Sequence, residues 1–140
     1  MKDLFNLVHP LPAIAPVSVA DNTPQVSAII DRQGFNSLTF MIALGSIADA
    51  DATFAVKLEH GSAANLSDAA DVTAADLLGT AALAAFTYAD DNKTRKIGYT
   101  GCLRYTRLTI TPTGNAAAAL VSAVALLGHP GHIPTANPPV

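Results

Sequence analysis

Residues 53–60 read TFAVKLEH, and their alternation of apolar and polar side chains decides the fold class. Phe54, Val56 and Leu58 lie on one face of an extended chain, and the residues between them lie on the other. This period of two indicates a strand with one buried face and one solvated face. A helix would repeat its apolar residues every three to four positions, and the sequence shows no such sustained repeat.

Segments on either side predict further strands separated by turn residues. Residues 37–44 are continuously apolar, which is typical of a central strand covered on both faces. Residues 81–88 favour a strand, although their alanines make a helix a competing assignment. Residues 65–78 predict either short helical turns or an irregular loop. The remaining predicted strands are residues 25–30, 94–99, 103–111 and the second half of 116–127.

Seven or eight short strands, spaced about ten residues apart, predict an all-β protein. The expected architecture is an antiparallel β-sandwich, for which a jelly roll is one topology. Composition agrees, because Glu59 is the single glutamate and lysine is scarce, so exposed helix faces would lack their usual residues. The predicted core contains Leu38, Phe40, Ile42, Phe54, Val56, Leu58, Leu108 and Ile110.

The chain divides into a body and two proline-rich ends. Its 140 residues are enough for one domain with one hydrophobic core, which we place at residues 25–128. Residues 1–24 contain four prolines and several large apolar side chains, so we expect an extended arm that packs on its own domain or reaches a neighbouring subunit. Because every predicted strand follows Pro24, we expect the body to fold without this arm. Residues 129–140 form a second proline-rich tail.

The surface is expected to be neutral and built from small side chains. Charged residues make up 14% of the chain, whereas about 25% is usual, and 27 of the 140 residues are alanine. The formal net charge of −3 argues against nucleic acid as a main partner, and no segment resembles a signal peptide or a membrane span. We therefore expect a soluble protein, made and used without secretion, that packs against copies of itself or a larger assembly.

No group of residues matches a catalytic or metal-binding pattern. His129 and His132 are three residues apart, but the prolines around them exclude the helix that would aim both at one metal. Asp49 and Asp51 resemble the start of a calcium loop without its later ligands, so an acidic turn is the better interpretation. Cys102, the single cysteine, is expected to be buried and unreactive. We predict a protein that is not an enzyme and needs no cofactor or metal.

Basic and acidic residues occupy different parts of the sequence. They either pair within one molecule or give two copies complementary surfaces. The basic group is Lys93, Arg95, Lys96, Arg104 and Arg107, and the acidic group is Asp49, Asp51, Glu59, Asp68, Asp71 and Asp76. The arm and the basic group together predict an interface formed by Leu4, Phe5, Leu7, Val8, Leu11, Ile14, Lys93, Arg95 and Lys96.

Five short segments are spread over most of the chain: GFNSLTF (34–40), ADLLGT (75–80), KIGY (96–99), RYTRLTITPT (104–113) and LLGHP (126–130). In these segments the sequence resembles a group of small virion proteins of tailed bacteriophages, often encoded close to the capsid genes. The resemblance implies a structural protein on the capsid exterior, made in the cytoplasm of the bacterial host. It implies the major capsid protein and sister subunits as partners, in a homo-oligomer such as a trimer.

Three other functions remain compatible with the sequence. Within the structural class, the chain would be a neck or tail component of the virion. A carbohydrate-binding β-sandwich is a different class, but it is disfavoured because the chain has no tryptophan and only 6% aromatic residues. A hydrolase that uses scattered aspartates is the weakest alternative.

Overall fold

Extended segments such as residues 53–60 dominate the structure, a computed structural model that describes residues 2–140. Among these residues, helical structure is limited to short turns: η1 (Phe5–Leu7), η2 (Ala74–Asp76), α1 (Ala81–Ala84) and η3 (Tyr88–Asp90). The strands are β1 (Val8–Val19), β2 (Gln25–Val26), β3 (Ile30–Asp31), β4 (Phe35–Ile47), β5 (Thr53–Gly61), β6 (Ala70–Asp71), β7 (Leu77–Leu78), β8 (Phe86–Thr87), β9 (Thr94–Tyr99), β10 (Tyr105–Thr113) and β11 (Ala119–Pro130).

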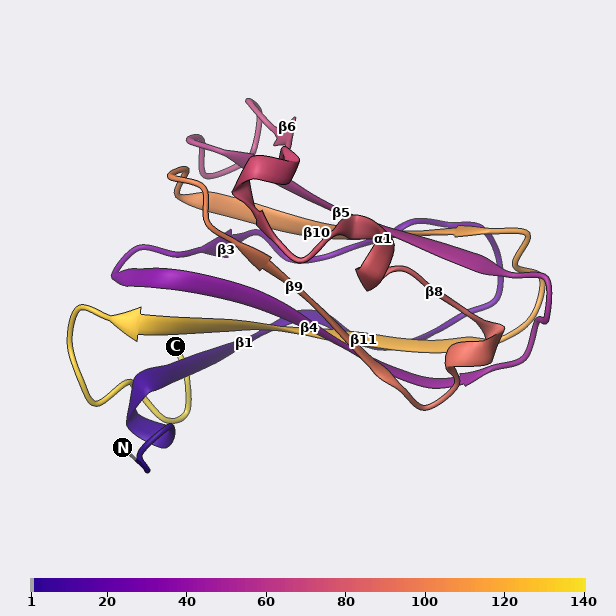
Figure 1. The fold of residues 1–140 in the computed structure, drawn as a ribbon, viewed down its shortest axis with the longest axis horizontal. Helices are drawn as coiled ribbons and strands as arrows, with labels where there is room; N and C mark the ends of the chain where they lie inside the picture. The colour runs from indigo at the N-terminus through magenta and orange to yellow at the C-terminus, as the bar shows by residue number, and fades with distance from the viewer. Residues whose placement is uncertain (1) are drawn as a thin grey trace.

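The strands form two antiparallel sheets that lie face to face (Figure 1). Sheet A has the order β1-β11-β4-β9-β7, and sheet B has the order β2-β10-β5-β6, with β3 beside β10 and β8 beside β5. Eight strand positions remain when β2 and β3 are counted as one, β6 and β8 are counted as one, and the short β7 is left out. Numbered again from 1 to 8 along the chain, these positions have the order 1-8-3-6 in sheet A and 2-7-4-5 in sheet B. This is the strand order of a jelly roll, so the predicted all-β sandwich is confirmed.

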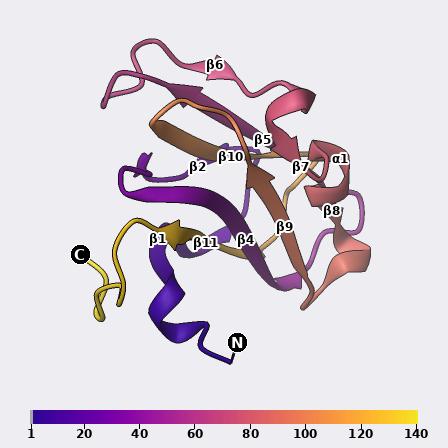
Figure 2. The same cartoon turned by 60° about the vertical axis from the view of Figure 1, so that its left-hand side comes forward.

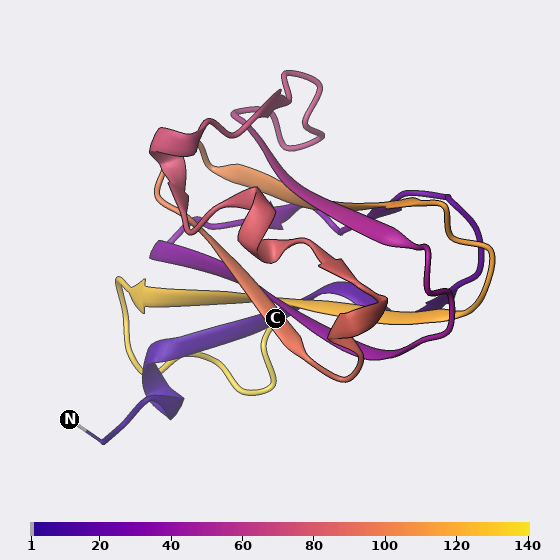
Figure 3. The same cartoon turned by 45° about the vertical axis from the view of Figure 1, so that its right-hand side comes forward.

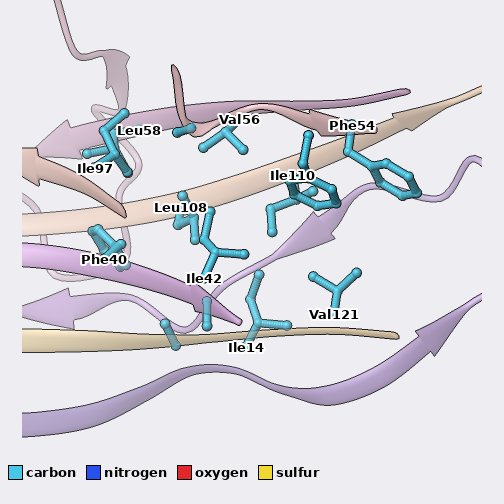
Figure 4. Packing of buried hydrophobic residues seen from close by; sticks show 14 of the residues in the cluster. Ile14, Phe40, Ile42, Phe54, Val56, Leu58, Ile97, Leu108, Ile110 and Val121 are labelled. Atoms are coloured by element: carbon cyan, nitrogen blue, oxygen red, sulfur yellow. The ribbon is translucent and has the colours of Figure 1, made fainter. Parts of the chain in front are cut away.

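The core fills the space between the sheets. All eight predicted core side chains are buried, including Phe54 of β5 and Leu108 of β10, which point toward residues of sheet A such as Ile42 (Figure 4). Phe54 also stacks on Phe86, with ring centroids 4.7 Å apart. Figure 2 shows how α1 and the segment around β7 and β8 cover the open side between β9 and β5.

Residues 8–19 belong to the sandwich, which corrects the expectation that all strands follow Pro24. β1 pairs with β11 from Val8 opposite Gly128 to Val19 opposite Ala119. The extended conformation was expected, and the structure places the segment on its own domain, the less specific of the two alternatives. Met1, the first residue of the predicted arm, lies outside the described residues.

Prolines are tolerated in β1 because it is an edge strand. The carbonyl oxygen of Val8 accepts a hydrogen bond from Thr135 Oγ1 (2.6 Å), so it points away from β11. Pro10 and Pro12 follow Val8 at intervals of two in the β1–β11 register, so their backbone nitrogen and carbonyl groups point the same way as those of Val8. Their nitrogens, which carry no hydrogen, therefore face the open edge and cost the ladder no hydrogen bond. The C-terminal tail packs here as well, because the Thr135 amide donates to the Asn6 carbonyl (3.1 Å).

Four predicted strands differ from the structure, and the last of them, β11, begins at Ala119 and runs to Pro130, past the predicted end of the body at residue 128. Residues 25–30 are divided into β2 and β3, because the Ser27 hydroxyl accepts the Leu108 amide hydrogen bond (2.9 Å) between them. Residues 81–88 begin with the helical turn α1, because the Thr80 hydroxyl accepts a hydrogen bond from the Leu83 amide (3.1 Å), and only Phe86–Thr87 form a strand. β4 is longer than residues 37–44 and is buried on its inner face alone, so the predicted cover on both faces is wrong.

Candidate interaction face

The side of sheet A that faces away from sheet B carries almost no charge. β1, β4 and β11 contain no Lys, Arg, Asp or Glu, which is unusual for strands with a solvated side. Among the outward residues of the described strands of sheet A, Lys96 on β9 is the only one with such a charge. We call this surface the outer face of sheet A, and its main side chains are Pro10, Pro12, Thr39, Met41, Ala43, Leu78, Lys96, Leu120, Ser122, Val124 and Leu126.

One row of paired residues crosses the centre of this face. Pro12 of β1 lies opposite Val124 of β11, and Val124 lies opposite Met41 of β4. Met41 in turn lies opposite Lys96 of β9, near the other side of the sheet. Met41 is 44% exposed and Val124 is 40% exposed, so large apolar side chains occupy the middle of an open surface. The single cation lies to one side of them.

Gly45 keeps the outer face of sheet A level at the end of the face that lies near the β1–β2 connection. Leu120 is 46% exposed and leans over Gly45 of the neighbouring strand β4. A Cβ atom at Gly45 would come within 2.8 Å of the Leu120 Cβ, which is closer than two such carbons can approach. Any larger residue at position 45 would therefore push Leu120 outward and make the face uneven.

The N-terminal turn η1 borders the opposite end of the face. Figure 1 shows η1 and the C-terminal tail on the side of sheet A that faces away from sheet B. Leu4 and Leu7 form one wall of an apolar groove of about 260 Å³, and Thr39 and Leu126 of sheet A form another. Leu4 and Phe5 are each 68% exposed. The turn therefore extends the apolar surface beyond the plane of the sheet.

The outer face of sheet B is different, because its charged residues pair with one another. Arg107 of β10 contacts Glu59 of β5 at 2.9 Å, and Lys57 contacts Asp71 of β6 at 3.1 Å. The hydrogen bond from Lys57 to Asp71 raises the pKa of the lysine. Such exposed pairs add little stability, but they show that this face is suited to water. Figure 3 shows the two sheets and their opposite faces from another side.

Most of the basic group is paired within the molecule, as one of the two alternatives predicted. Arg104 donates two hydrogen bonds to the Asp31 carboxylate, at 2.8 and 2.7 Å, and these hold the pKa of Asp31 below its usual value. Arg95 and Lys93 both contact Asp90, whose pKa is lowered mainly by the Thr87 amide.

The predicted interface residues fall into three environments. Leu4 and Phe5 are exposed, and Leu7, Val8 and Leu11 are half-buried. Lys93 and Arg95 lie at the Asp90 turn, and Lys96 lies on the outer face of sheet A. Ile14 is 7% exposed and packs in the core, so its assignment to an interface is wrong.

A polar cluster beside the 100–104 loop has a structural role. His60 Nδ1 lies 2.9 Å from the Tyr99 hydroxyl, which accepts a hydrogen bond from the Leu103 amide (3.1 Å). Arg32 lies over the Tyr99 ring and donates to the carbonyl oxygens of Leu103 (2.6 Å) and Gly101 (2.9 Å). Burial raises the pKa of Tyr99, so its hydroxyl stays protonated. These contacts hold the loop closed, and they leave the guanidinium aimed at the backbone of its own chain.

The remaining candidates for chemistry are isolated from one another. His129 Nδ1 lies 2.9 Å from the Ser37 hydroxyl. Cys102 is exposed, so its predicted burial is wrong: it lies in the 100–104 loop rather than in a strand. Residues 2–140 contain no group of three or more His, Cys, Asp or Glu side chains placed to hold a metal ion. No helix within the same range is both long and apolar enough to cross a membrane.

The outer face of sheet A was not identified residue by residue from the sequence. The available signal was the run of uncharged residues in each of three segments, 8–19, 35–47 and 119–130. The low overall charge is evident from the sequence, but that the uncharged segments become neighbouring strands depends on the long-range pairing of the jelly roll. Alternation alone cannot supply that pairing.

Comparison with known proteins gives no family. No family model matches the chain, and no curated protein matches it. Among solved structures, the dimeric latent PorU of Porphyromonas gingivalis aligns with 87% of this chain at 10% identity and a TM-score of 0.43. The CBM22-1–GH10 modules of xylanase 10B from Clostridium thermocellum, complexed with xylohexaose, align with 95% at 10% identity and a TM-score of 0.47. The chain spans 12% and 28% of those proteins, and likenesses this distant do not bear on function.

Proposed function

We propose that this chain is a non-enzymatic structural protein of a tailed-bacteriophage virion, which decorates the capsid exterior and stabilises it by bridging neighbouring capsomers. The observation that carries the proposal is the contrast between its two outer faces. Sheet B presents ion pairs to water, whereas sheet A presents Met41, Val124 and Leu120 without a charged neighbour other than Lys96. An exposed apolar surface of this kind marks a site of protein contact.

The sequence resemblance to small virion proteins supports the same function and suggests that the contacts are made on the capsid exterior. Subunits repeated over a shell need only weak individual contacts, because each further contact within the same particle is effectively intramolecular. A rigid sandwich with one apolar face supplies such contact area without a catalytic centre. The major capsid protein and sister subunits are the expected partners, and a position at the neck or tail is the competing location.

The test is reconstitution of particles that lack this chain. Purified protein is added, and an electron-microscopy map is compared with the map of the untreated particle. We expect new density on the capsid exterior between capsomers, together with release of DNA at a higher temperature. Density confined to the neck or tail would show that the chain is a neck or tail component and not a decoration protein. A map without new density would refute the proposal.

Two matched variants test whether assembly on the particle needs the outer face of sheet A, through contacts with the capsid or with a sister subunit. Val124→Asp places a carboxylate at the centre of the outer face of sheet A, and Ala55→Asp places one on the exposed side of β5 in sheet B. Both positions are exposed, so neither change should disturb the core. We expect Val124→Asp to lower occupancy on the particle and Ala55→Asp to leave it unchanged. Equal occupancy of the two variants would show that the outer face of sheet A is not needed for assembly on the particle.

A further inference from the structure

We infer that the outer face of sheet A packs against the same face of a second copy of this chain, forming a twofold dimer. The inference deepens the proposed function. The existence of the dimer does not depend on that function, but the role of the dimer in the virion does. A twofold dimer presents each remaining surface of the chain twice, once from each protomer. Bridging of two capsomers would follow from this symmetry.

Charge identifies the partner. Ordinary domains contain about 25% charged residues, most of them at the surface, and a partner of that kind would bury charges against a face that offers them only Lys96. Burying an unpaired charge costs several kcal/mol, so such a partner is disfavoured. The partner must instead be neutral and apolar over a whole sheet face. Among the described surfaces of this chain, the outer face of sheet A is the one that meets this requirement.

Size agrees with a stable dimer. Four strands of sheet A, β1, β11, β4 and β9, lie side by side. At spacings of about 4.8 Å between strands and about 3.3 Å along them, rows of roughly nine residues give a plane of about 570 Å². The accessible area of a surface with protruding side chains exceeds that of the plane, and exposed Leu4 and Phe5 add to it. Stable dimers bury about 800 Å² on each partner, which is the same scale.

The shape and the edge of the sheet favour face-to-face packing. Twisted sheets pack on one another about 10 Å apart at an angle of about −30°, and two identical sheets have matching twist. Pairing through the edge of β1 is blocked, because Pro10 and Pro12 lack amide hydrogens and the Val8 carbonyl is occupied by Thr135. Level packing near Leu120 depends on Gly45, whose missing side chain lets the leucine lie flat.

The single cation is also compatible with this symmetry. A twofold axis that runs between β11 and β4 places β9 of each protomer opposite β1 of its partner. The two Lys96 residues then lie about three strand spacings apart across the interface, or about 14 Å. Each Lys96 lies opposite the partner's edge strand β1, at the border of the interface, where its long side chain keeps the ammonium group in water and the repulsion is screened. Met41 of each protomer faces the partner's Val124 at the centre.

The test is the mass of the purified full chain in solution, measured by sedimentation equilibrium without any phage particle. We expect the wild-type protein to be a dimer of two 14.4 kDa chains. Met41→Asp should raise the dissociation constant by about 100-fold, because it buries two carboxylates near the axis. Ala55→Asp, with the same added charge on sheet B, should leave the constant unchanged.

Mixing distinguishes a lost interface from a damaged fold. Met41→Asp and Met41→Lys should each be monomeric, and an equimolar mixture should form dimers again, because opposite charges then meet at the axis. A folding defect would not be repaired by mixing. A monomeric wild-type protein at concentrations of about 100 μM, a trimer, or dissociation by Ala55→Asp alone would overturn the inference. None of these outcomes depends on binding to the particle, so the dimer and the proposed function fail separately.

Discussion

Removal of residues 1–24 is expected to unfold the protein, which reverses the expectation drawn from the sequence. A chain that starts at Gln25 loses β1, and β11 becomes the edge strand of sheet A. The change removes side chains from the interior as well as from the surface. The matched control is a chain that starts at Val8, which loses the exposed Leu4 and Phe5 but keeps the whole of β1.

The magnitude follows from what β1 buries. Ile14 and Val19 are 7% and 4% exposed, and full burial of such side chains contributes roughly 1.5–3 kcal/mol each, or about 3–6 kcal/mol together. β1 pairs with β11 at nine positions with two interruptions of the register, which implies on the order of six backbone hydrogen bonds; at about 0.5 kcal/mol each they add roughly 3 kcal/mol. The sum, about 6–9 kcal/mol, is comparable to the whole stability of about 5–15 kcal/mol that is usual for a domain.

The assay is thermal unfolding followed by circular dichroism in the far ultraviolet. We expect no cooperative transition for the chain that starts at Gln25. The chain that starts at Val8 should unfold cooperatively within a few degrees of the full-length protein, because exposed side chains contribute little to stability. If the chain that starts at Gln25 unfolded cooperatively at the temperature of the full-length protein, β1 would not be part of the folded core.

Two other perturbations have clear expected results. Phe54→Ala and Leu108→Ala each remove a fully buried side chain and should cost roughly 2–5 kcal/mol by urea unfolding; unchanged midpoints for both would contradict the core packing. The pKa of Asp31 is held below 3.8 by Arg104, so unfolding takes up protons and the pair contributes stability that is present above about pH 4 and lost as pH falls through the folded pKa. Asp31→Asn should therefore be less stable than wild type at pH 7, and the difference should shrink at pH values below 3.8; a constant difference would show that the ion pair is not responsible.

Local alternation was sufficient to predict most of the core but not the first strand. Residues 53–60 alternate cleanly and residues 103–111 are rich in β-branched and aromatic side chains, and both became central strands of sheet B. β1 was missed because its prolines argue against a strand in general. Their even spacing, at positions 10 and 12, is compatible with an edge strand, since both nitrogens then face away from the neighbour. Recognising this requires knowledge of which strand lies at the edge.

The candidate face depends on long-range pairing in the same way. The apolar run 37–44 was interpreted as a strand covered on both sides, since burial explains such a run most simply. In the structure its outer residues, Met41 among them, are exposed within this chain. Cys102 was expected to be buried as an apolar residue, but the Tyr99 hydroxyl and Arg32 hold its loop at the surface.

The blunt edge of β1 limits how this protein can grow into larger assemblies. A sheet edge that accepts a strand presents a fresh edge of the same kind, so edge contacts propagate into fibres of indefinite length. A face is consumed when one partner covers it, and the contact then stops. Because Pro10 and Pro12 lack amide hydrogens, the edge of β1 does not take a further strand. Association through the outer face of sheet A ends when one partner covers it. Copies that associate through this face would therefore form units of fixed size, and the β1 edge would not extend them into a longer sheet.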